Sequence, residues 1–296
     1  MREGFVTVPG GKVFHRTVGE DAPGIPLLVL HGGPGIPHDY LEPLEALGRE
    51  RPVVFYDQLG CGASDRPDDL SLYALPRFVE ELAVVRGELG LERMHLLGQS
   101  WGAMLAVEYY LENRPRGIAS LVLSGPCLDS RRFAADQRVH LAHMPEPVQA
   151  AILKAEATGD FEAATYQEAI GAYYAKHVCR LDPWPECLNR AVEKMNMAVY
   201  GHMWGPSEFT CTGTLKEHGR RDELGSIRVP VLFTCGAQDE ATPATVAGYQ
   251  ALIPGAELRV FENASHSHHL EQPEAYLSAV SDFLRRVEGG QSGTSS

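Results

Sequence analysis

The fold is decided by residues 94–110, which read Met-His-Leu-Leu-Gly-Gln-Ser-Trp-Gly-Ala-Met-Leu-Ala-Val-Glu-Tyr-Tyr. The first residues form a mostly apolar run typical of a buried strand, and the residues after Gly102 follow the pattern of a helix. Glycine at positions 98 and 102 lets the strand and the helix pass close together, which predicts a strained turn with the Ser100 hydroxyl clear of the backbone. The same pentapeptide is compatible with an ordinary turn in which a serine caps the helix. Other parts of the chain must therefore decide whether Ser100 is a nucleophile.

The composition is that of a chain with a large apolar core. Of the 296 residues, 44% are hydrophobic, which is sufficient for one large domain or for a domain with an insertion. The formal net charge is −13, from 26 basic and 39 acidic residues, and no basic run occurs, so neither a nucleic acid nor a membrane is expected as a partner. The N-terminus has no charged segment followed by an apolar one, and no run of about 18 apolar residues occurs. These features predict a cytoplasmic protein.

The cysteines do not have the spacing of a metal or redox centre. They are Cys61, Cys127, Cys179, Cys187, Cys211 and Cys235. None falls in a C-x-x-C pair, so neither a zinc site nor a thioredoxin-type centre is expected. Free thiols are the simplest expectation, and a bond between Cys179 and Cys187 stays open because spacing alone cannot establish a disulfide.

Apolar runs alternate with helical patterns along most of the chain. Continuous apolar runs, which strands buried on both faces of a parallel sheet require, occur at residues 26–30, 52–56, 120–124 and 229–235, with a further strand at 257–261. Helical patterns are expected at 39–48, 75–90, 242–252 and 273–287, and an antiparallel hairpin at 5–8 and 12–18. This alternation predicts an α/β fold with a mostly parallel, doubly wound sheet.

Between residues 128 and 228 the alternation stops. Apolar residues recur there at spacings of three and four in the stretches 166–177 and 188–199, which predicts helices. An insertion at this point is expected to be a helical cap over the C-terminal edge of the sheet, controlling access to a site without supplying its nucleophile or base. The expected division is a core of residues 1–127 and 229–288, a cap of residues 128–228, and a flexible Gly/Ser-rich tail of residues 289–296.

A glycine-rich loop, His31-Gly-Gly-Pro-Gly35, follows the strand at 26–30. Acyl transfer develops a negative charge on the carbonyl oxygen, and two backbone N–H groups can stabilise it. Gly33 and Trp101 are the candidate donors, one from this loop and one from the residue after Ser100. A phosphate cradle is disfavoured because the loop lacks the lysine and spacing of a phosphate-binding motif, while a turn without any ligand stays open.

Two further candidates follow later strands. Asp239 comes directly after the run at 229–235, where a carboxylate can orient a histidine, although aspartate is also common in turns. His266 is the first histidine after the last strand, and the chain order Ser, Asp, His is that of α/β-hydrolases. His268 and His269 are expected to pack. A metal held by the three histidines is disfavoured because no carboxylate or cysteine set with ligand spacing accompanies them.

With these loops, the sequence resembles the proline iminopeptidase family of serine peptidases. It looks most like the tricorn-interacting aminopeptidase branch and the related amino acid amidases, and the resemblance extends over residues 5–287. The matching motifs are His31-Gly-Gly-Pro-Gly35, Tyr56-Asp-Gln-Leu-Gly-Cys-Gly-Ala-Ser64, Gly98-Gln-Ser-Trp-Gly102, Gly205-Pro-Ser-Glu-Phe209 with Thr212-Gly-Thr214, Gly236-Ala-Gln-Asp-Glu-Ala-Thr-Pro243 and Ser265-His-Ser267. Ala103 and Ser265 each replace a glycine of the family pattern, and neither is expected to affect the chemistry.

The resemblance implies a catalytic triad of Ser100, Asp239 and His266. It also implies that Glu208 and Glu240 bind the free amine of the substrate. The simpler alternatives for these two residues are a solvated cap carboxylate and an acid near a helix N-terminus. Trp204, a bulky residue of the cap, is expected to contribute to substrate binding.

The predicted function is hydrolysis of an amide or peptide bond next to a free N-terminal residue, through an acyl-enzyme on Ser100. The expected partner is a small molecule or short peptide with a free amine, and no metal or cofactor is expected. An esterase or lactonase with the same triad is the alternative enzyme, and a ligand-binding protein that keeps the fold is the non-enzymatic alternative. Epoxide and haloalkane hydrolases are disfavoured because they need a carboxylate where this chain has Ser100.

Overall fold

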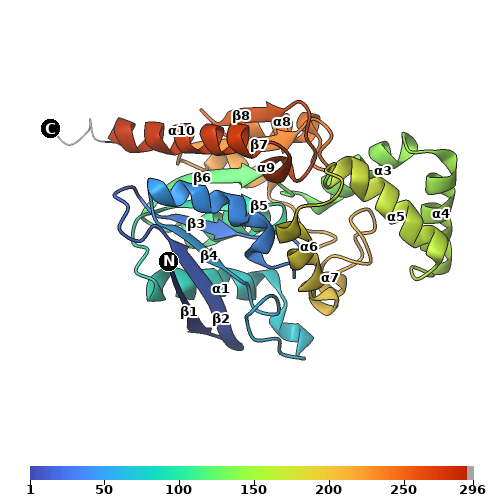
Figure 1. Cartoon of the computed structure of the whole chain (residues 1–296), viewed down its shortest axis with the longest axis horizontal. Coiled ribbons are helices and arrows are strands. Elements are labelled where there is room, and N and C mark those ends of the chain that lie inside the picture. The colour runs from blue at the N-terminus through green and yellow to red at the C-terminus, as the bar shows by residue number, and fades with distance from the viewer. Residues whose placement is uncertain (292–296) are drawn as a thin grey trace.

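Within the described residues, 1–291, the centre of the computed structural model is an eight-stranded sheet (Figure 1). Its strands are β1 (Arg2–Val8), β2 (Gly11–Val18), β3 (Leu27–Leu30), β4 (Val53–Tyr56), β5 (Met94–Gln99), β6 (Ile118–Ser124), β7 (Val231–Gly236) and β8 (Glu257–Phe261). They lie in the order β1-β2-β4-β3-β5-β6-β7-β8. The hairpin β1–β2 and the pair β2–β4 are antiparallel, and all remaining pairs are parallel. The predicted α/β fold with a mostly parallel sheet is confirmed.

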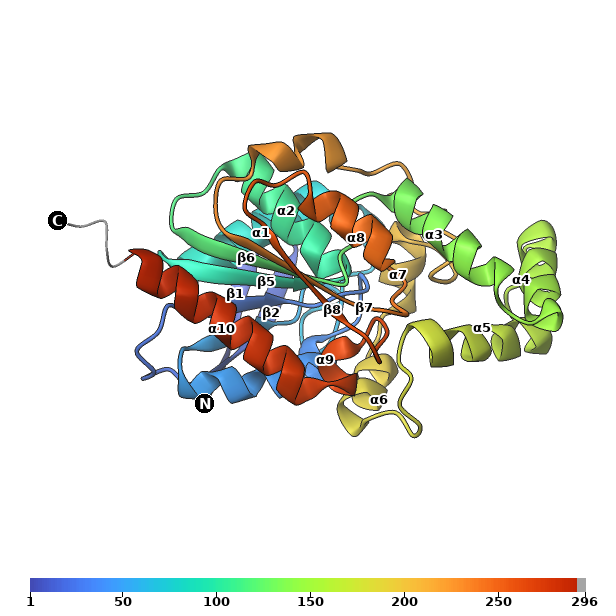
Figure 2. The same ribbon diagram turned by 90° about the horizontal axis from the view of Figure 1, so that it is seen from above.

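The central strands are continuously apolar because helices cover both faces of the sheet. Every residue of β3, β4, β5, β6 and β7 is buried. One face is covered by α1 (Leu75–Glu88), α2 (Trp101–Asn113) and α8 (Pro243–Gln250), and the other by η1 (His38–Arg49) and α10 (Pro273–Gln291) (Figure 2). β8, at the sheet edge, alternates between more and less exposed residues.

Two helical segments differ from their predicted type or extent. The helix expected at 39–48 is the 3-10 helix η1, and Pro43 inside it has no N–H for an α-helical hydrogen bond. α10 continues to Gln291, so residues 289–291 are helical although they were expected in the tail. The rest of that expected tail, 292–296, lies outside the described residues. No helix within residues 1–291 has the length and apolar character needed to cross a membrane.

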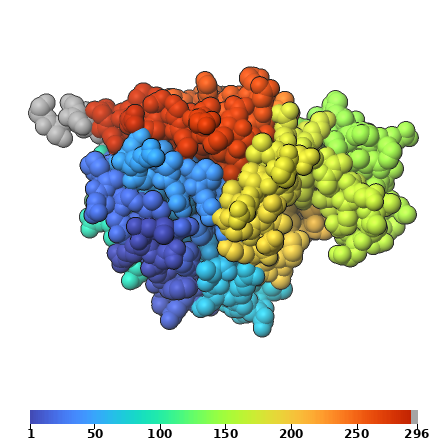
Figure 3. Space-filling view, viewed as in Figure 1, coloured from blue at the N-terminus to red at the C-terminus, as the bar shows by residue number. Residues whose placement is uncertain are grey.

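The helices between β6 and β7 form a cap at the C-terminal edge of the sheet. They are α3 (Ser130–Ala142), α4 (Glu146–Thr158), α5 (Ala164–His177), α6 (Glu186–Glu193) and α7 (Met197–Met203). α3, α4 and α5 project beyond the sheet and enclose an apolar cluster of their own, which includes Ile152, Tyr166, Tyr173 and Phe209 (Figure 3). α6 lies closer to the core and contacts η1.

The predicted helical stretch 188–199 is divided into two helices. α6 ends at Glu193, and the Asn196 side chain caps α7 by accepting from the N–H groups of Ala198 and Val199. Val192 is exposed, although the spacing placed it on the buried side. Asn196 therefore starts a new helix two residues after Lys194, the C-cap of α6, and the apolar spacing does not continue through this break.

The end of the insertion packs on the core. Leu215, Leu224 and Ile227 belong to the same buried cluster as α2, and η3 (Arg221–Ser226) lies in this stretch. Arg220 forms an ion pair with Glu108 of α2 at 2.6 Å. The cap helices therefore end well before the predicted boundary at residue 228, and the return segment joins the core. Two short elements, η2 (Leu70–Leu72) and α9 (His268–Glu271), complete the core.

The turn from β5 into α2 has the close backbone contacts that its glycines predict. Ser100 has φ 56° and ψ −118°, a conformation that residues with a side chain rarely adopt. A Cβ atom at Gly98 would lie 2.2 Å from the Gly102 carbonyl oxygen, and one at Gly102 would lie 2.2 Å from that of Leu30. The Ser100 side chain makes no capping hydrogen bond to α2, so the alternative of a helix-capping serine is wrong.

We predict that Gly102→Ala strongly destabilises the protein, because the new methyl group would overlap the backbone of β3. The expected loss in free energy of unfolding is about 3 kcal/mol or more, measured as a lower denaturant midpoint. Gly87→Ala in α1 is the matched control, since no atom lies within 4 Å of a Cβ placed there. That control should be neutral or up to about 1 kcal/mol more stable. Equal midpoints for the two variants would contradict the close contact.

Candidate active site

The three predicted triad residues lie at the C-terminal edge of the sheet. Ser100 follows β5, Asp239 follows β7, and His266 follows β8. His266 Nδ1 is 2.7 Å from Asp239 Oδ1, and because an ionised carboxylate only accepts hydrogen bonds, Nδ1 carries the proton. The Nε2 atom of a neutral His266 can then accept a proton from a nucleophile.

Gly125, which the sequence analysis did not single out, lies between the turn at Ser100 and the His266–Asp239 pair. Its neighbour Ser124 accepts a hydrogen bond from the Ser100 N–H at 2.9 Å. A Cβ atom at Gly125 would lie 2.8 Å from His266 Nδ1 and 3.3 Å from Asp239 Oδ2. Glycine is therefore required where the end of β6 passes beneath the His–Asp pair, and a Gly-Pro pair directly after a predicted strand is the sequence signal for it.

Burial and charge act in opposite directions on this pair. Burial alone would raise the pKa of Asp239, but the charge of His266 and its hydrogen bond lower that pKa below the usual range. Burial alone would lower the pKa of His266, but the Asp239 carboxylate raises it above the ordinary value of 6.5. Asp239 also accepts from the N–H groups of Gly236 at 3.1 Å and Ala241 at 2.9 Å. Asp239 therefore stays ionised and holds His266 in the tautomer that a general base needs.

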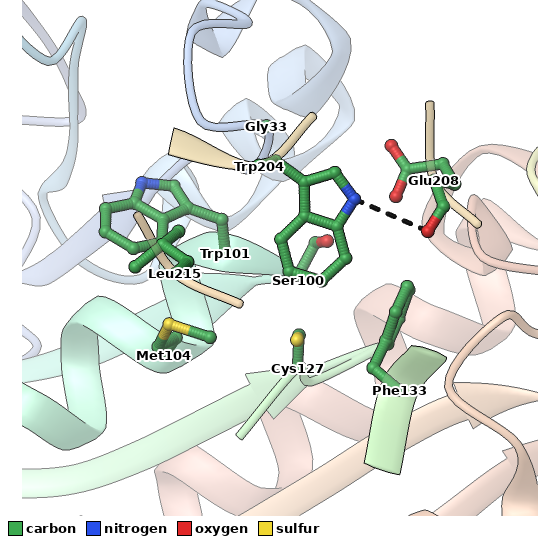
Figure 4. A pocket seen from close by; sticks show the side chains of 9 residues that line it. All are labelled: Gly33, Ser100, Trp101, Met104, Cys127, Phe133, Trp204, Glu208 and Leu215. Carbon is green, nitrogen blue, oxygen red and sulfur yellow. Dashed lines mark hydrogen bonds between the residues drawn. The ribbon is translucent and has the colours of Figure 1, made fainter. Parts of the chain in front are cut away.

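The two predicted backbone donors border the cavity at Ser100. Gly33 and Trp101 line it together with Ser100 (Figure 4). Trp101 is the first residue of α2, so its N–H has no acceptor inside the helix. Across residues 1–291 neither this N–H nor that of Gly33 is paired with a backbone carbonyl. Gly33 has φ 104°, which favours glycine. Both N–H groups are thus available to a ligand oxygen.

Side chains from other elements fix the positions of the loop 31–35 and of the start of α2. The sequence analysis assigned these side chains no role. The Gly32 N–H donates to Tyr40 Oη at 2.7 Å, and Tyr40 Oη donates to Gln99 Oε1 at 2.6 Å. The indole Nε1 of Trp101 donates to Gln58 Oε1 at 2.8 Å. Gln58 lies in a motif that the resemblance included without a function, and the structure shows that it ties the start of α2 to the loop after β4.

The cavity beside Ser100 has mostly apolar walls. Its lining comprises Met104, Cys127, Phe133, Trp204 and Leu215, with Glu208 as the acidic residue (Figure 4). The Trp204 ring packs edge-to-face against Phe133, with 5.4 Å between the ring centroids. Trp204 Nε1 donates to the Ser207 carbonyl at 3.1 Å, which fixes the indole in the wall. An apolar group of a ligand next to Ser100 would therefore contact mostly apolar side chains.

Glu208, from the cap, lines this cavity, and Glu240, from the loop after β7, is close enough to be affected by the charge of Glu208. Glu208 is partly buried and accepts from Tyr200 Oη at 2.6 Å. Glu240 is 1% exposed, and its Oε1 has no hydrogen-bond partner among the described residues. Burial raises the pKa of both carboxyls, and the charge of Glu208 raises the pKa of Glu240 further. Neither residue is a solvated acid, and Thr242 caps α8 in place of Glu240.

Helix α3 of the cap is hydrogen-bonded to the loop after β7, which carries Asp239 and Glu240. His140 Nε2 donates to the Asp239 carbonyl at 3.0 Å, and Gln137 Nε2 donates to the Glu240 carbonyl at 3.0 Å. Gln137 is fully buried. The cap was expected to control access and to contribute Glu208 and Trp204 to substrate binding, and these bonds show that it also holds the backbone of the Asp239–Glu240 loop.

Helix α5 is hydrogen-bonded to the loop after β7 and to the loop after β8. His177 Nδ1 donates to the Gln238 carbonyl at 2.9 Å, and the His177 carbonyl accepts from the His266 N–H at 3.0 Å. The rings of His140 and His177 stack with 4.0 Å between centroids. Burial lowers the pKa of both imidazoles, that of His177 to about 4, so both rings are neutral near pH 7 and can stack without repulsion.

The three neighbouring histidines have different partners. His266 is bonded to Asp239, whereas His269 Nε2 donates to the Tyr40 carbonyl at 3.1 Å and His268 is directed toward β6 and β7. In the part of the chain that the structure describes, no three His, Cys, Asp or Glu side chains are grouped to hold a metal ion.

All six cysteines are free thiols, including Cys179 and Cys187, whose pairing the sequence left open. Burial raises the pKa of the Cys127 thiol, the one that lines the cavity, well above its ordinary value. Cys127 is therefore a protonated, apolar part of the wall.

Comparison with known proteins first shows the class of protein to which this chain belongs. A family model described as the alpha/beta hydrolase fold matches residues 25–273. The match includes the strands that precede Ser100, Asp239 and His266 together with the inserted cap. The protein is therefore an α/β-hydrolase, in agreement with its strand order and with the turn at Ser100.

The relatives then give the family. A proline iminopeptidase of Heyndrickxia coagulans is 43% identical over 286 residues, which cover 96% of this chain and 99% of that protein. The crystal structure of a proline iminopeptidase of Mycobacterium smegmatis has a TM-score of 0.91 and 34% identity, over 98% of this chain and 100% of that chain. The crystal structure of VinJ has a TM-score of 0.93 and 34% identity, over 97% and 99%. The chain is an enzyme of the proline iminopeptidase family, as its motifs predicted.

We predict that Ser100→Ala abolishes turnover while the protein stays folded, because the hydroxyl is the only nucleophile that this arrangement offers. The expected loss in kcat is on the order of a millionfold if the triad acts as a unit. His266→Ala should be similarly damaging, whereas His269→Ala should retain most of the activity. The measurement is kcat on an aminoacyl arylamide, with thermal unfolding as the folding control. A Ser100→Ala variant with a tenth of wild-type activity would exclude the serine mechanism.

The bonds from the cap generate a second prediction. Replacing His140 and His177 together by phenylalanine keeps two stacked rings but removes both donors to the Asp239 loop. The rate at which a small phosphonate labels Ser100 should then fall about tenfold, because misplacing the acid also misplaces His266. Trp204→Ala is the contrasting variant, which should change the substrate range and leave labelling close to wild type. Wild-type labelling in the double variant would show that the cap only gates access.

Proposed function

We propose that the protein hydrolyses the amide bond that follows a free N-terminal residue, through an acyl-enzyme on Ser100. The observation that supports this most strongly is the pair of acids formed by Glu208, which lines the cavity with Ser100, and Glu240, whose pKa the charge of Glu208 raises. Two acids withdrawn from water are unfavourable while both are ionised, and the ammonium group of a substrate compensates their charge. The iminopeptidase names of the relatives support proline as the N-terminal residue.

In the acylation half-reaction, Ser100 Oγ attacks the carbonyl carbon of the N-terminal residue while His266 Nε2 takes the hydroxyl proton. The N–H groups of Gly33 and Trp101 stabilise the negative oxygen that forms. The His266 imidazolium, stabilised by Asp239, then donates its proton to the leaving nitrogen. The C–N bond breaks, the shortened peptide or amine departs, and the N-terminal residue remains as an ester on Ser100.

Deacylation repeats these steps with water. His266 takes a proton from a water molecule, whose oxygen attacks the ester carbonyl, and the same two N–H groups stabilise the second oxyanion. His266 returns the proton to Ser100 Oγ as the ester bond breaks. The product is the free N-terminal amino acid, and the enzyme regains its starting protonation state.

The two glutamates determine how the substrate is oriented. An ammonium between Glu208 and Glu240 places the carbonyl of the same residue at a fixed distance from its charge, so that this carbonyl reaches Ser100. A blocked amine would leave both acids without a counter-charge. An esterase or lactonase with the same triad has no need for the unpaired Oε1 of Glu240, and is therefore the weaker candidate. The cytoplasmic location stays a prediction.

We predict a selective effect of removing either charge of this pair. Glu208→Gln and Glu240→Gln should each lower kcat/KM for free-amine substrates by about 30-fold or more, because truncating one partner of a desolvated charge pair costs about 2–5 kcal/mol. Hydrolysis of a small amine-free ester should change little, since the triad and the backbone donors are untouched. The measurement is kcat/KM on a prolyl arylamide, its N-acetylated analogue and the ester.

The N-acetylated arylamide is the internal control for the wild type, which should cleave it far more slowly than the free amine. Equal cleavage of the two would remove the basis for amine recognition. A parallel loss of ester and aminoacyl activity in both glutamate variants would assign these residues to the general structure of the site and favour the esterase.

A further inference from the structure

His268 lies on the side of Asp239 that faces away from His266. Its side chain is completely buried. The Nδ1 atom is 3.5 Å from Asp239 Oδ2 and 3.2 Å from the Ser265 carbonyl oxygen. Since an ionised carboxylate and a carbonyl only accept hydrogen bonds, Nδ1 must carry the proton and direct it between these two oxygens.

The opposite nitrogen of the ring faces two hydroxyl groups on neighbouring strands. His268 Nε2 is 2.9 Å from Ser124 Oγ of β6 and 2.9 Å from Thr234 Oγ1 of β7. With the proton on Nδ1, Nε2 is the acceptor for one of these hydroxyls. Tyr276 Oη donates in turn to Ser124 Oγ at 3.2 Å. Hydrogen bonds therefore run without a gap from Tyr276, beneath the sheet edge, to the ring of His268.

Aromatic neighbours fix the plane of this ring. Phe261 stacks on His268 with 5.4 Å between centroids and 21° between the planes, and Tyr276 packs edge-on at 5.3 Å. A ring held on both nitrogens and on its face has one orientation available. The direction of the Nδ1–H bond is thus set by the core, independently of any substrate.

We propose that His268 is a positioning residue that holds Asp239 from behind, so that Oδ1 of the carboxylate stays aligned with His266. This inference rests on the triad of the proposed function. Asp239 then receives one backbone and one imidazole donor on each oxygen, with Gly236 N–H and His268 on Oδ2 and Ala241 N–H and His266 on Oδ1. A purely packing role, which the sequence predicted for His268, does not account for this arrangement.

Removing the Nδ1–H donor should have a defined effect on His266. With less compensation of its charge, the Asp239 carboxylate would bind the His266 proton more tightly and raise the pKa of His266 further. Because catalysis needs neutral His266, the acid limb of the pH profile would move to higher pH. The Glu208 and Glu271 carboxylates also raise the pKa of His266, and His269 and Tyr276 are titratable groups that pack against the His268 ring.

Two amide substitutions separate a positioning role from a structural one. The side-chain nitrogen of His268→Asn falls near the place of Nδ1 and keeps the donor, whereas that of His268→Gln falls near the place of Nε2 and loses it. His269→Asn and His269→Gln are matched controls at the adjacent buried histidine, which is bonded to Tyr40 and not to Asp239. All variants are assayed on a small amine-free ester, so that recognition of a free amine by Glu208 and Glu240 does not enter the comparison.

We expect His268→Gln to lower kcat about tenfold and to shift the acid limb of kcat/KM upward, and His268→Asn to stay close to wild type. Equal profiles for these two variants, or the same shift in His269→Gln, would overturn the positioning role. ¹⁵N NMR of the wild-type imidazoles tests the same point without any substitution, because a proton on Nε2 of His268 would also overturn it. Loss of free-amine preference with an intact ester profile would instead refute the proposed function alone.

Discussion

The close passage of three backbone segments at Gly98 and Gly102 is the constraint on which the rest of the site depends. It forces Ser100 into a positive φ, and neither glycine can be replaced without overlap with a carbonyl group. From that point, the loop after β3 and the N-terminus of α2 bring two free N–H groups to the same cavity. The chemistry is therefore positioned by main-chain geometry, and side chains such as Tyr40 and Gln58 maintain it.

Two adjacent acids, Asp239 and Glu240, have pKa values that are shifted in opposite directions. Asp239 accepts hydrogen bonds from three donors and stays ionised, whereas its neighbour Glu240 has a buried oxygen without a donor among the described residues and a raised pKa. Asp239 is bonded to His266, and the role we propose for Glu240 is to bind the charge of a ligand. The cap supplies both Glu208 and the bonds that hold the Asp239–Glu240 loop, so a change in the cap is expected to alter the geometry of the site.

Local patterns predicted most of the fold and the triad. Continuous apolar runs require burial on both faces, and residues that follow parallel strands necessarily meet at one edge, so Ser100, Asp239 and His266 were all predicted at strand ends. What the patterns could not predict depends on contacts between distant residues. The break between α6 and α7 coincides with a hydrogen bond from Asn196 Nδ2 to the Gly60 carbonyl, 136 positions earlier, and the role proposed for His268 depends on Ser124, 144 positions earlier. Single-residue signals do not encode such pairings.

The most direct test of the amine site is the number of protons exchanged when a cationic ligand binds. Prolinamide can be titrated calorimetrically into the Ser100→Ala protein near pH 6, in buffers of different ionisation enthalpy. Because burial raises the pKa of Glu208 and Glu240, entry of the ammonium should expel protons that these acids hold in the free enzyme. Net proton release that disappears in Glu240→Gln is predicted. Binding without proton release, or equal binding of the N-acetylated amide, would contradict a site built from two acids for a free amine.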